Sequence, residues 1–298
     1  MEKTLVVLAG PTAVGKTTCA IRMASHLGTE IISADSRQVY RETRIGTAVP
    51  SDKELSQVRH HFIQCTSIHD PYNASRFEKE ALSILESLFS EHDQVIMAGG
   101  SGLYIEAVCK GIDDFPAHDP GLRAELRGRL DEEGLQPLFA WLAELDPESH
   151  QRIDLNNHMR VLKALEVTLQ TGIPYSSFLN TSPRKRPFRI RRMALDMDRH
   201  ALYKRINSRV DAMMEDGLRG EAESLWDFRN LTPLKSVGYR ELFRYMDGEL
   251  SLGEAVEQIK GNTRKFARKQ LTWFRKDNLY TWFRPDQYDE MIRWIAEA

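Results

Sequence analysis

The residues best suited to chemistry form the stretch Gly10-Pro11-Thr12-Ala13-Val14-Gly15-Lys16-Thr17, close to the start of the chain. Its two glycines allow backbone angles that bulkier residues resist, so that successive N–H groups can converge on one anion. Lys16 adds a mobile positive charge for an outer phosphate, and the hydroxyl of Thr17 is placed to bind Mg²⁺. The stretch therefore predicts a site for a phosphate ester and a magnesium ion. It does not say which ester is held, or which bond breaks.

The elements around this stretch support that prediction. An apolar run, Leu5–Ala9, precedes it, and a helical pattern, Thr18–Leu27, follows it. Strand, glycine-bounded loop, Lys-Thr and helix make up the phosphate-binding P-loop. The helix N-terminus behind the loop contributes about half a positive charge. This context makes a chance glycine-rich turn a poor explanation.

A second candidate group follows the next predicted strand. Glu30–Ala34 reads as a strand and ends in Asp35-Ser36-Arg37-Gln38. In doubly wound sheets the strand ends beside a P-loop face the ligand. Asp35 is therefore a candidate for Mg²⁺ binding or for proton abstraction. A turn or helix-capping aspartate is an equally good interpretation of the same position.

A third predicted strand, Val95–Ala98, leads into Gly99-Gly100-Ser101-Gly102-Leu103-Tyr104. The glycines let a helix begin close to the site and leave the Ser101 hydroxyl exposed toward a ligand. This strand lacks the terminal aspartate that P-loop ATPases often use to hold Mg²⁺. Asp196 is a possible substitute, although it lies far along the chain.

Length and composition set limits on the rest. The 298 residues are enough for two domains, and the net charge of −2 argues against indiscriminate nucleic-acid binding. The sequence has no apolar run near 18 residues, so we expect no transmembrane helix, and no targeting segment ahead of the first strand. The three cysteines form no CxxC pair, which fits a reducing cytosol. We expect a cytoplasmic protein that is a monomer.

The pattern changes after about Gly111 to short helices without strands. Asp119-Pro120 and Asp146-Pro147 each predict a helix start, with Asp as the cap and Pro at the first helical position. Met193–Met197 then reads as a returning strand. We therefore expect an α/β fold, a P-loop NTPase-like parallel sheet flanked by helices, with an all-helical insertion and a helical C-terminal part. The predicted bounds are 1–112 for the first part of the core, 113–187 for the insertion, and 188–298 for the returning strand and C-terminal helices.

Two basic segments stand out in this nearly neutral chain. Residues 184–192 carry six basic residues in nine, and Gly261–Lys276 carries six with no acid. The second segment also holds Phe266, Trp273 and Phe274, and basic plus aromatic side chains suit single-stranded or looped RNA. Each segment alone fits a solvated surface better. Together they favour a polyanionic partner.

An ordered set of motifs resembles the tRNA dimethylallyltransferase family, also called isopentenylpyrophosphate tRNA transferases. The motifs are Gly10–Thr17, Asp35–Tyr40, Gly99–Tyr104, Ser236–Arg240 and Arg268–Arg275. P-loops are common, but this succession along nearly the whole chain is not. The family transfers a dimethylallyl group from its diphosphate to N6 of the adenine just 3′ of the anticodon. The resemblance implies dimethylallyl diphosphate as the donor and a tRNA anticodon stem-loop as the acceptor.

The resemblance also implies roles for single residues. The P-loop would hold a diphosphate that leaves, with Lys16, Thr17 and Mg²⁺ neutralising its charge. Arg209 looks like the family's second diphosphate-binding arginine, and Asp35 matches the family's general base. By resemblance, tRNA contacts map onto Asp35, Ser36, Arg37, Gln38, Ser101, Arg123, Met159, Arg160, Val161, Leu162, Lys163, Lys235, Ser236, Val237, Gly238, Tyr239 and Arg240.

The chain departs from the family pattern in two places. Ser101 stands where Thr is frequent, which keeps the hydroxyl, and the C-terminal Cys/His zinc finger of eukaryotic members is missing. A bacterial type is therefore expected. The alternatives are a P-loop kinase for a small metabolite, an RNA-binding protein with a nucleotide switch, and a prenyltransferase acting on free adenine nucleotides. The missing acid after Ala98 weakens the first two, and the helical insertion and basic segments disfavour the last.

Overall fold

The computed structural model describes residues 2–113, 115–116, 119–154, 157–179 and 183–297. The chain divides into two compact units. Unit 1 contains the residues up to Lys110 and from Lys185 onward, and unit 2 is Gly111–Arg184. Sequence analysis placed the insertion at 113–187.

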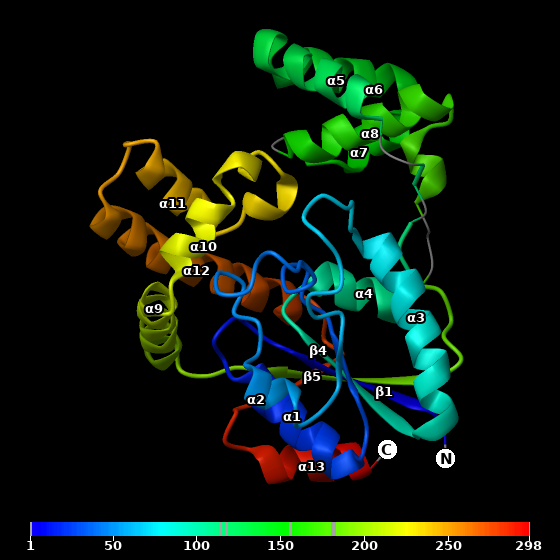
Figure 1. Ribbon diagram of the computed structural model, residues 1–298. Helices are drawn as coiled ribbons and strands as arrows, with labels where there is room; N and C mark the ends of the chain where they lie inside the picture. The colour runs from blue at the N-terminus through cyan, green and yellow to red at the C-terminus, as the bar shows by residue number, and fades with distance from the viewer. Residues whose placement is uncertain (1, 114, 117–118, 155–156, 180–182, 298) are drawn as a thin grey trace. The chain divides into compact units, whose positions relative to one another are not determined.

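Unit 1 is built on a six-stranded sheet whose described pairs are all parallel, with the strand order β3-β2-β4-β1-β5-β6. The strands are β1 (Thr4–Ala9), β2 (Ile31–Ser33), β3 (His60–His61), β4 (Gln94–Gly99), β5 (Arg189–Leu195) and β6 (Tyr280–Phe283). β1 is buried along its whole length between β4 and β5 (Figure 1). Because the strands are parallel, the loops after β1, β2 and β4 leave the sheet at one edge.

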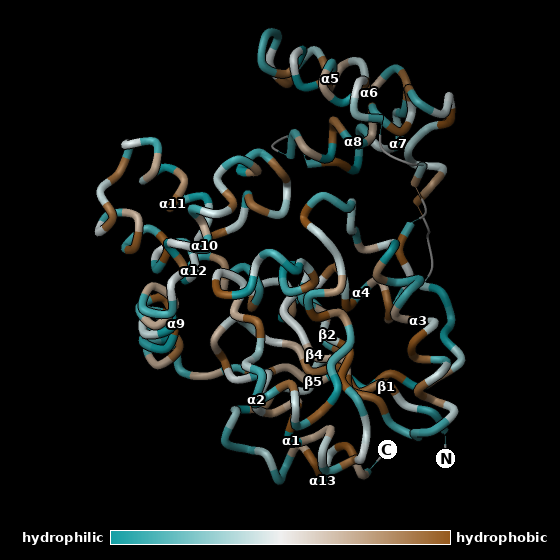
Figure 2. Tube along the Cα trace, in the orientation of Figure 1, coloured by the Kyte–Doolittle hydropathy of each residue, from teal (hydrophilic) through white to brown (hydrophobic). Residues whose placement is uncertain are grey.

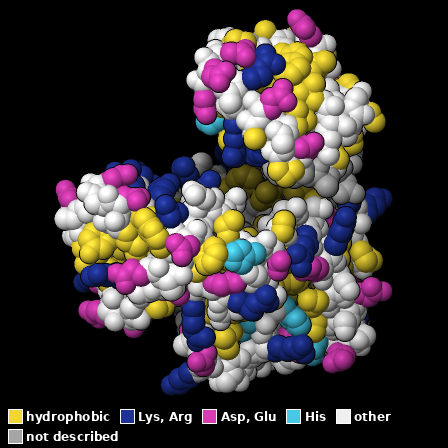
Figure 3. Space-filling view, turned by 45° about the horizontal axis from the view of Figure 1, so that its top comes forward, with side chains coloured by type: hydrophobic (Ala, Val, Ile, Leu, Met, Phe, Trp, Pro, Cys, Tyr) yellow, Lys and Arg dark blue, Asp and Glu magenta, His cyan; other side chains and the backbone are white. Residues whose placement is uncertain are grey.

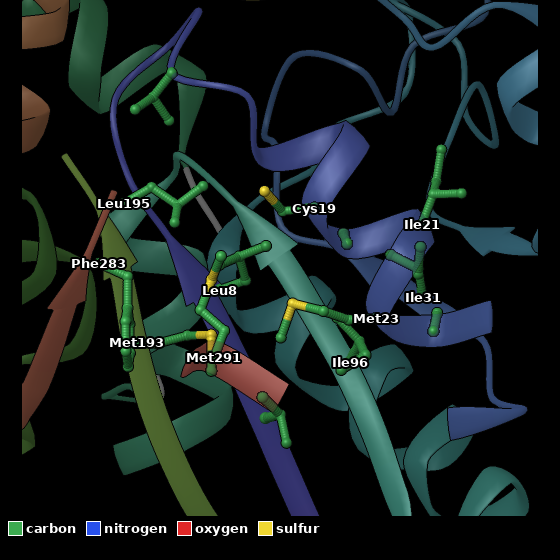
Figure 4. Close-up of a cluster of buried hydrophobic side chains, with 14 of the residues drawn as sticks. Leu8, Cys19, Ile21, Met23, Ile31, Ile96, Met193, Leu195, Phe283 and Met291 are labelled. Atoms are coloured by element: carbon green, nitrogen blue, oxygen red, sulfur yellow. The ribbon is translucent and has the colours of Figure 1, made fainter. Parts of the chain in front are cut away.

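Helices cover both faces of this sheet. The helices α1 (Lys16–Leu27) and α13 (Tyr288–Ala296) lie on one face, and α3 (Ala74–Glu91) and α4 (Gly102–Lys110) lie on the other (Figure 1). Successive side chains of a strand point to opposite faces of the sheet. Where successive residues of a strand are brown in Figure 2, the strand therefore presents apolar side chains to both faces. Figure 4 shows Leu8 of β1, Met23 of α1 and Met291 of α13 in one buried cluster.

The remaining part of unit 1 is helical. Its helices are α2 (Asp52–Leu55), α9 (Arg199–Glu215), α10 (Leu218–Ser224), α11 (Tyr239–Met246) and α12 (Leu252–Arg275). Ser51 and Ser251 begin α2 and α12 with a capping box, in which Glu54 and Glu254 bond back to the cap. α12 packs against α4, α9 and α11, so it connects the helical part to the sheet.

Unit 2 consists of α5 (Pro120–Glu133), α6 (Leu135–Leu145), α7 (Pro147–Arg152) and α8 (His158–Thr171). Asp119 caps α5 through the N–H groups of Gly121 and Leu122, and Asp146 caps α7 through that of Ser149. Leucines from α5, α6 and α8 form its core. α5 and α7 therefore begin where Asp119-Pro120 and Asp146-Pro147 predicted a helix start.

The predicted fold class is confirmed: a parallel sheet flanked by helices, with helices in the insertion. Between β2 and α3 the chain forms α2 and β3, and neither was predicted. β6, α11 and α13 were not predicted individually. β5 ends at Leu195, so Asp196 and Met197 lie beyond the strand predicted for 193–197. None of the helices in the described residues is long and apolar enough to cross a membrane.

Candidate active site

The P-loop forms at the end of β1 as predicted. Gly10 and Gly15 have φ of 148° and 109°, in the region that favours glycine. A Cβ on Gly10 would lie 2.9 Å from the carbonyl oxygen of Leu195, so the loop packs directly on the end of β5. Gly15 caps α1 without a side-chain hydrogen bond. The first N–H groups of α1 are therefore free of a side-chain cap and suited to an anion.

Lys16 is folded back over this loop. Its Nζ donates to the carbonyl oxygens of Gly10 at 2.9 Å and Pro11 at 2.7 Å. Burial lowers the pKa of Lys16 to about 8, the Asp35 carboxylate opposes that fall, and the Arg209 guanidinium adds to it. An anion bound to the loop would favour the charged ammonium. A phosphate ligand on the loop would therefore raise the pKa of Lys16.

A cavity of about 1140 Å³ in unit 1 collects most of the predicted site residues. Those that line it are Thr12, Ala13, Gly15, Lys16, Thr17, Asp35, Ser36, Arg37, Gln38, Ser101, Arg209, Lys235, Ser236, Val237, Gly238 and Arg240. Gly10, Pro11 and Val14 are buried in the P-loop itself. The loop predicted to hold phosphate and the predicted base therefore open into one space.

Asp35 is held in a fixed turn after β2. Its Oδ1 accepts a hydrogen bond from the N–H of Arg37 at 2.9 Å. The N–H of Ser36 donates to Oγ of Ser101 at 2.9 Å, and the N–H of Ser101 donates to the carbonyl oxygen of Ala34. The loop that carries Asp35 and the turn that carries Ser101 are thus bonded to each other.

Arg37 and Gln38 extend this loop toward two other segments. Nη1 of Arg37 donates to the carbonyl oxygen of Pro233 at 3.3 Å, just before Lys235–Arg240. Nε2 of Gln38 donates to the carbonyl oxygen of Ala48 at 2.8 Å. The side chains predicted to bind RNA therefore also connect the segments that line the cavity.

Arg209 reaches the cavity from α9, and Arg205 lies one turn before it. Burial lowers the pKa of Arg209, and the nearby Arg205 lowers it further, whereas Glu54 and Asp35 oppose the shift. Nη2 of Arg205 would lie 3.6 Å from a Cβ on Gly15. Sequence analysis missed Arg205, although its i, i+4 spacing to Arg209 on a predicted helix was a usable signal. Lys16, Arg205 and Arg209 therefore bring three positive charges close to the P-loop, which suits an anionic ligand.

One face of α12 supplies the apolar side of the cavity. Phe266, Lys269, Gln270 and Trp273 line it, and Phe266 and Trp273 are 45% and 41% exposed. A Cβ on Gly102 would lie 2.1 Å from Nε1 of Trp273, so the indole packs directly on the first residue of α4. In Figure 3, Lys and Arg side chains lie along the upper edge of the helical part of unit 1, at the left of the view, above a hydrophobic patch.

The loop after Tyr40 forms another wall that sequence analysis did not predict. The carboxylate of Glu221 on α10 accepts hydrogen bonds from the N–H groups of Arg44, Ile45 and Gly46 at 2.8–2.9 Å and from the Tyr239 hydroxyl at 2.6 Å. Tyr239 is fully buried, and burial raises its pKa. Tyr239 therefore holds this wall in place from within the protein, where its side chain is closed to an RNA surface.

The predicted contacts in the insertion belong to unit 2. Nη1 of Arg123 pairs with Glu166 at 3.3 Å. Met159 and Arg160 are exposed at the start of α8 and Lys163 is half-buried, whereas Val161 and Leu162 are buried in the core of unit 2. Because Val161 and Leu162 are buried, they can contribute to RNA binding only by supporting their exposed neighbours.

The basic run 184–192 differs from its expected role. Arg186 forms an ion pair with Glu78 at 2.6 Å, and Arg192 forms one with Asp277 at 2.7 Å, with all four side chains largely buried. The guanidinium of Arg191 lies over the Trp294 ring. These arginines stabilise unit 1, so the run is not one continuous surface for a polyanion.

Oxygen donors of the kind that bind Mg²⁺ line the cavity. Thr17 and Asp35 bring a hydroxyl and a carboxylate to the cavity, and the described residues contain no group of three or more His, Cys, Asp or Glu side chains that could hold a metal. Mg²⁺ often keeps several waters and binds substrate phosphates with one or two protein oxygens. Asp196 is bonded to Arg275 at 2.6 Å, which argues against its role as the substitute ligand.

The match to a family model shows which protein family this chain belongs to. The IPP transferase model matches residues 38–277. The chain belongs to the IPP transferase family. Over 99% of its length it is 47% identical to tRNA dimethylallyltransferase 1 of Phocaeicola vulgatus, of which it covers 98%.

Solved structures of this family have the same fold. The full-length tRNA isopentenylpyrophosphate transferase of Bacillus halodurans is 36% identical with a TM-score of 0.72, and the alignment covers 100% of this chain and 96% of that one. The tRNA delta(2)-isopentenylpyrophosphate transferase of Staphylococcus epidermidis is 32% identical with a TM-score of 0.71, covering 99% of each chain. The resemblance inferred from the motifs is thus confirmed at the level of family and fold.

Proposed function

We propose that this protein is a cytoplasmic tRNA dimethylallyltransferase. It transfers a dimethylallyl group from dimethylallyl diphosphate to N6 of the adenine 3′-adjacent to the anticodon, tRNA position 37, and releases diphosphate. The observation that carries the proposal is the shared cavity, into which the P-loop and Asp35 both open. A group transfer needs its donor and its acceptor held in contact, and a single cavity provides this.

The donor end of the reaction is assigned to the P-loop and α9. The N-terminus of α1, Lys16 and Arg209 bind the diphosphate. When the C–O bond to the dimethylallyl carbon breaks, negative charge grows on the diphosphate, and these groups stabilise it. Arg205 adds a further positive charge near Gly15. Thr17 would help to hold Mg²⁺, which would offset part of the charge of the leaving group.

The acceptor end is assigned to Asp35. The exocyclic amine of adenine is a weak nucleophile, so close placement and a base both help. The N6 nitrogen forms its bond to the dimethylallyl carbon as the C–O bond breaks, and the N6 proton passes to the carboxylate of Asp35. The hydrogen bond from the N–H of Arg37 to Oδ1 fixes the direction of that carboxylate.

The RNA is assigned to the rest of the cavity wall. An anticodon-loop adenine must leave its stack to reach a buried site, and Phe266 and Trp273 offer exposed aromatic surface beside the cavity. Lys235 and Arg240 supply positive charge on the same wall. In unit 2 the exposed Arg160 and Met159 remain our candidates for further contacts.

Nucleoside mass spectrometry tests the proposal. Unmodified tRNA is incubated with the protein, Mg²⁺ and dimethylallyl diphosphate, then digested to nucleosides. We expect a mass gain of one dimethylallyl group on adenosine. Parallel reactions with AMP as acceptor, or with ATP and no prenyl donor, test the other functions. Prenylated AMP with unmodified tRNA would move the protein to the free-nucleotide enzymes, and loss of the γ-phosphate without prenylation would favour a kinase.

A further inference from the structure

Gln270 forms a hydrogen-bonded bridge between two segments that line the cavity. Its side chain lies on α12 and is only 7% exposed. Oε1 accepts a hydrogen bond from the N–H of Thr12 in the P-loop at 2.8 Å, and Nε2 donates to the carbonyl oxygen of Gly100 at 2.9 Å. One neutral side chain therefore joins the phosphate-binding loop to the turn after β4.

The bridge lies where the sheet stops holding its strands together. β1 and β4 pair up to Ala9 and Gly99, and β2 pairs with β4 up to Ser33 and Ala98. Beyond Ala9 and Gly99 the sheet pairing between β1 and β4 ends, whereas the N–H of Ser101 still donates to the carbonyl oxygen of Ala34. Gln270 joins Gly100, the residue after the end of β4, to Thr12, three residues after the end of β1.

The bridge continues to the loop that carries the proposed base. After Gly100, Ser101 donates through its N–H to the carbonyl oxygen of Ala34, and its Oγ accepts from the N–H of Ser36. A continuous set of hydrogen bonds thus runs from Thr12 through Gln270 and Ser101 to the residues on either side of Asp35. This set connects the donor end of the cavity to the acceptor end.

The chemistry of the bridge requires an amide. Thr12 needs an acceptor and Gly100 needs a donor, and a glutamine side chain provides both. A Cβ on Gly100 would lie 2.3 Å from Nε2, so the amide approaches the backbone at a place only glycine permits. Glutamate would keep the acceptor but place a carboxylate oxygen against the Gly100 carbonyl. Methionine has a similar length and would leave both backbone groups without this partner.

We propose that Gln270 is a positioning residue, which sets the distance between the bound diphosphate and Asp35 and transmits occupancy of the P-loop to the turn at 99–102. The inference rests on the proposed function. Phe266, Lys269 and Trp273 share its face of α12, so the helix that lines the acceptor end also carries the bridge. The reaction needs the bound diphosphate and Asp35 at the right separation. Small displacements of either one therefore slow the transfer step rather than weaken substrate binding.

Kinetics provide the first test, with Gln270→Met and a matched control, Gln258→Met, on the same helix outside the cavity. We expect Gln270→Met to bind dimethylallyl diphosphate and tRNA within about threefold of wild type and to slow single-turnover transfer about 10- to 100-fold. Gln258→Met should transfer normally. Normal single-turnover transfer by folded Gln270→Met overturns the inference, and so does a loss confined to donor affinity.

A second variant has a pH signature that a purely structural role would not produce. In Gln270→Glu, a protonated carboxyl regains a donor for the Gly100 carbonyl. Its deficit relative to wild type at the same pH should therefore shrink between about pH 8 and about pH 6, because burial raises the pKa of a carboxyl. A deficit that is constant across this range contradicts the amide's donor role.

Hydrogen exchange tests the bridge without any transfer, using inorganic diphosphate with Mg²⁺ as the probe. In wild type, the probe should slow amide exchange in residues 10–17 and also in 99–104. In Gln270→Met it should slow exchange only in residues 10–17. Equal protection of both segments in the variant, or none at 99–104 in wild type, overturns the inference. A wild-type protein that fails to prenylate tRNA refutes the proposed function instead, and the two failures remain distinct.

Discussion

Lys16 and Asp35 lie at the same cavity, and the carboxylate of Asp35 acts on the pKa of Lys16. Burial lowers the pKa of Lys16 to about 8, and the Asp35 carboxylate works against that shift. The lysine is therefore close to losing its proton at the upper end of the physiological range, before any phosphate is bound. A bound diphosphate would add negative charge and raise the pKa of Lys16.

Donor binding should consequently depend on pH in one direction. Lys16 is charged below about pH 8 and neutral above it, so affinity for dimethylallyl diphosphate should fall as the pH rises past that value. Calorimetry in buffers of different ionisation enthalpy should also show proton uptake on binding near pH 8. Lys16→Arg keeps its charge throughout and should lose this dependence. An unchanged pH profile in Lys16→Arg would assign the dependence to another group.

Lys16→Ala and Arg209→Ala should each weaken donor binding. Each removes a charge-assisted contact, typically worth about 1.5–3 kcal/mol, and tRNA affinity should change little. The control is Arg199→Ala, an exposed arginine at the start of the same helix as Arg209. Calorimetry with the donor and filter binding with tRNA separate the two effects. Loss of tRNA affinity with normal donor affinity would refute this assignment.

Asp35→Asn should bind both substrates yet transfer far more slowly. Asn keeps an oxygen that can accept from the N–H of Arg37 but cannot take the N6 proton. The single-turnover rate should fall by roughly 10²–10⁴-fold if general-base catalysis is the main loss. The alternative role of Asp35 is that of a Mg²⁺ ligand. Measuring the donor affinity of the same variant at several Mg²⁺ concentrations distinguishes this role from that of a base. Weakened donor binding that excess Mg²⁺ restores would make Asp35 a metal ligand.

Charge on α12 should control the salt dependence of tRNA binding. Lys265, Arg268 and Lys269 are exposed, and Arg264 donates to Asn207 at 2.7 Å. Neutralising the first three should weaken binding and flatten its dependence on salt, because fewer counterions are released. Turnover at saturating tRNA should fall less. The same salt slope before and after neutralisation would show that these cations do not contact RNA.

Arg186→Ala should destabilise the protein. It removes a buried ion pair with Glu78 and the hydrogen bonds to the carbonyl oxygens of Ala107 and Val108. Breaking a buried pair of this kind costs about 3–5 kcal/mol, which denaturant unfolding can measure. The control Arg189→Ala removes an exposed arginine from β5 and should change stability by less than about 0.5 kcal/mol. Equal losses in the two variants would contradict the structural role of Arg186.

The sequence predicts those parts of the site that depend on local pattern. The P-loop follows from eight consecutive residues, and Asp35 and Ser101 follow from the rule that parallel strand ends share an edge. Arg205 could have been found from its i, i+4 spacing to Arg209, but Glu221 and Gln270 could not be placed from local pattern. Gln270 meets Thr12 across 258 positions, and Glu221 meets Ile45 across 176. Such pairs depend on how distant helices pack, which no local spacing encodes.

For the basic run at 184–192, the sequence pattern indicates exposure where the structure shows partial burial. Six charges in nine residues indicate a solvent-exposed surface, but β5 begins inside the run and turns Arg192 inward. Charge density along a chain carries no information on which charges a strand will bury. The partners Glu78 and Asp277 lie far away in sequence, so the pairing emerges only from the fold.

Three glycines at the end of β4 and just after it, Gly99, Gly100 and Gly102, each pack against a different part of the site. A single methyl group would press on the Ala34 backbone from Gly99, on the Gln270 amide from Gly100, and on the Trp273 indole from Gly102. The nearest atoms differ in kind: a rigid backbone, a hydrogen-bonded side chain and an aromatic ring. Alanine at Gly99, Gly100 or Gly102 would thus displace, one at a time, the loop that carries Asp35, the Gln270 bridge or the Trp273 side chain. Each displacement could be followed independently.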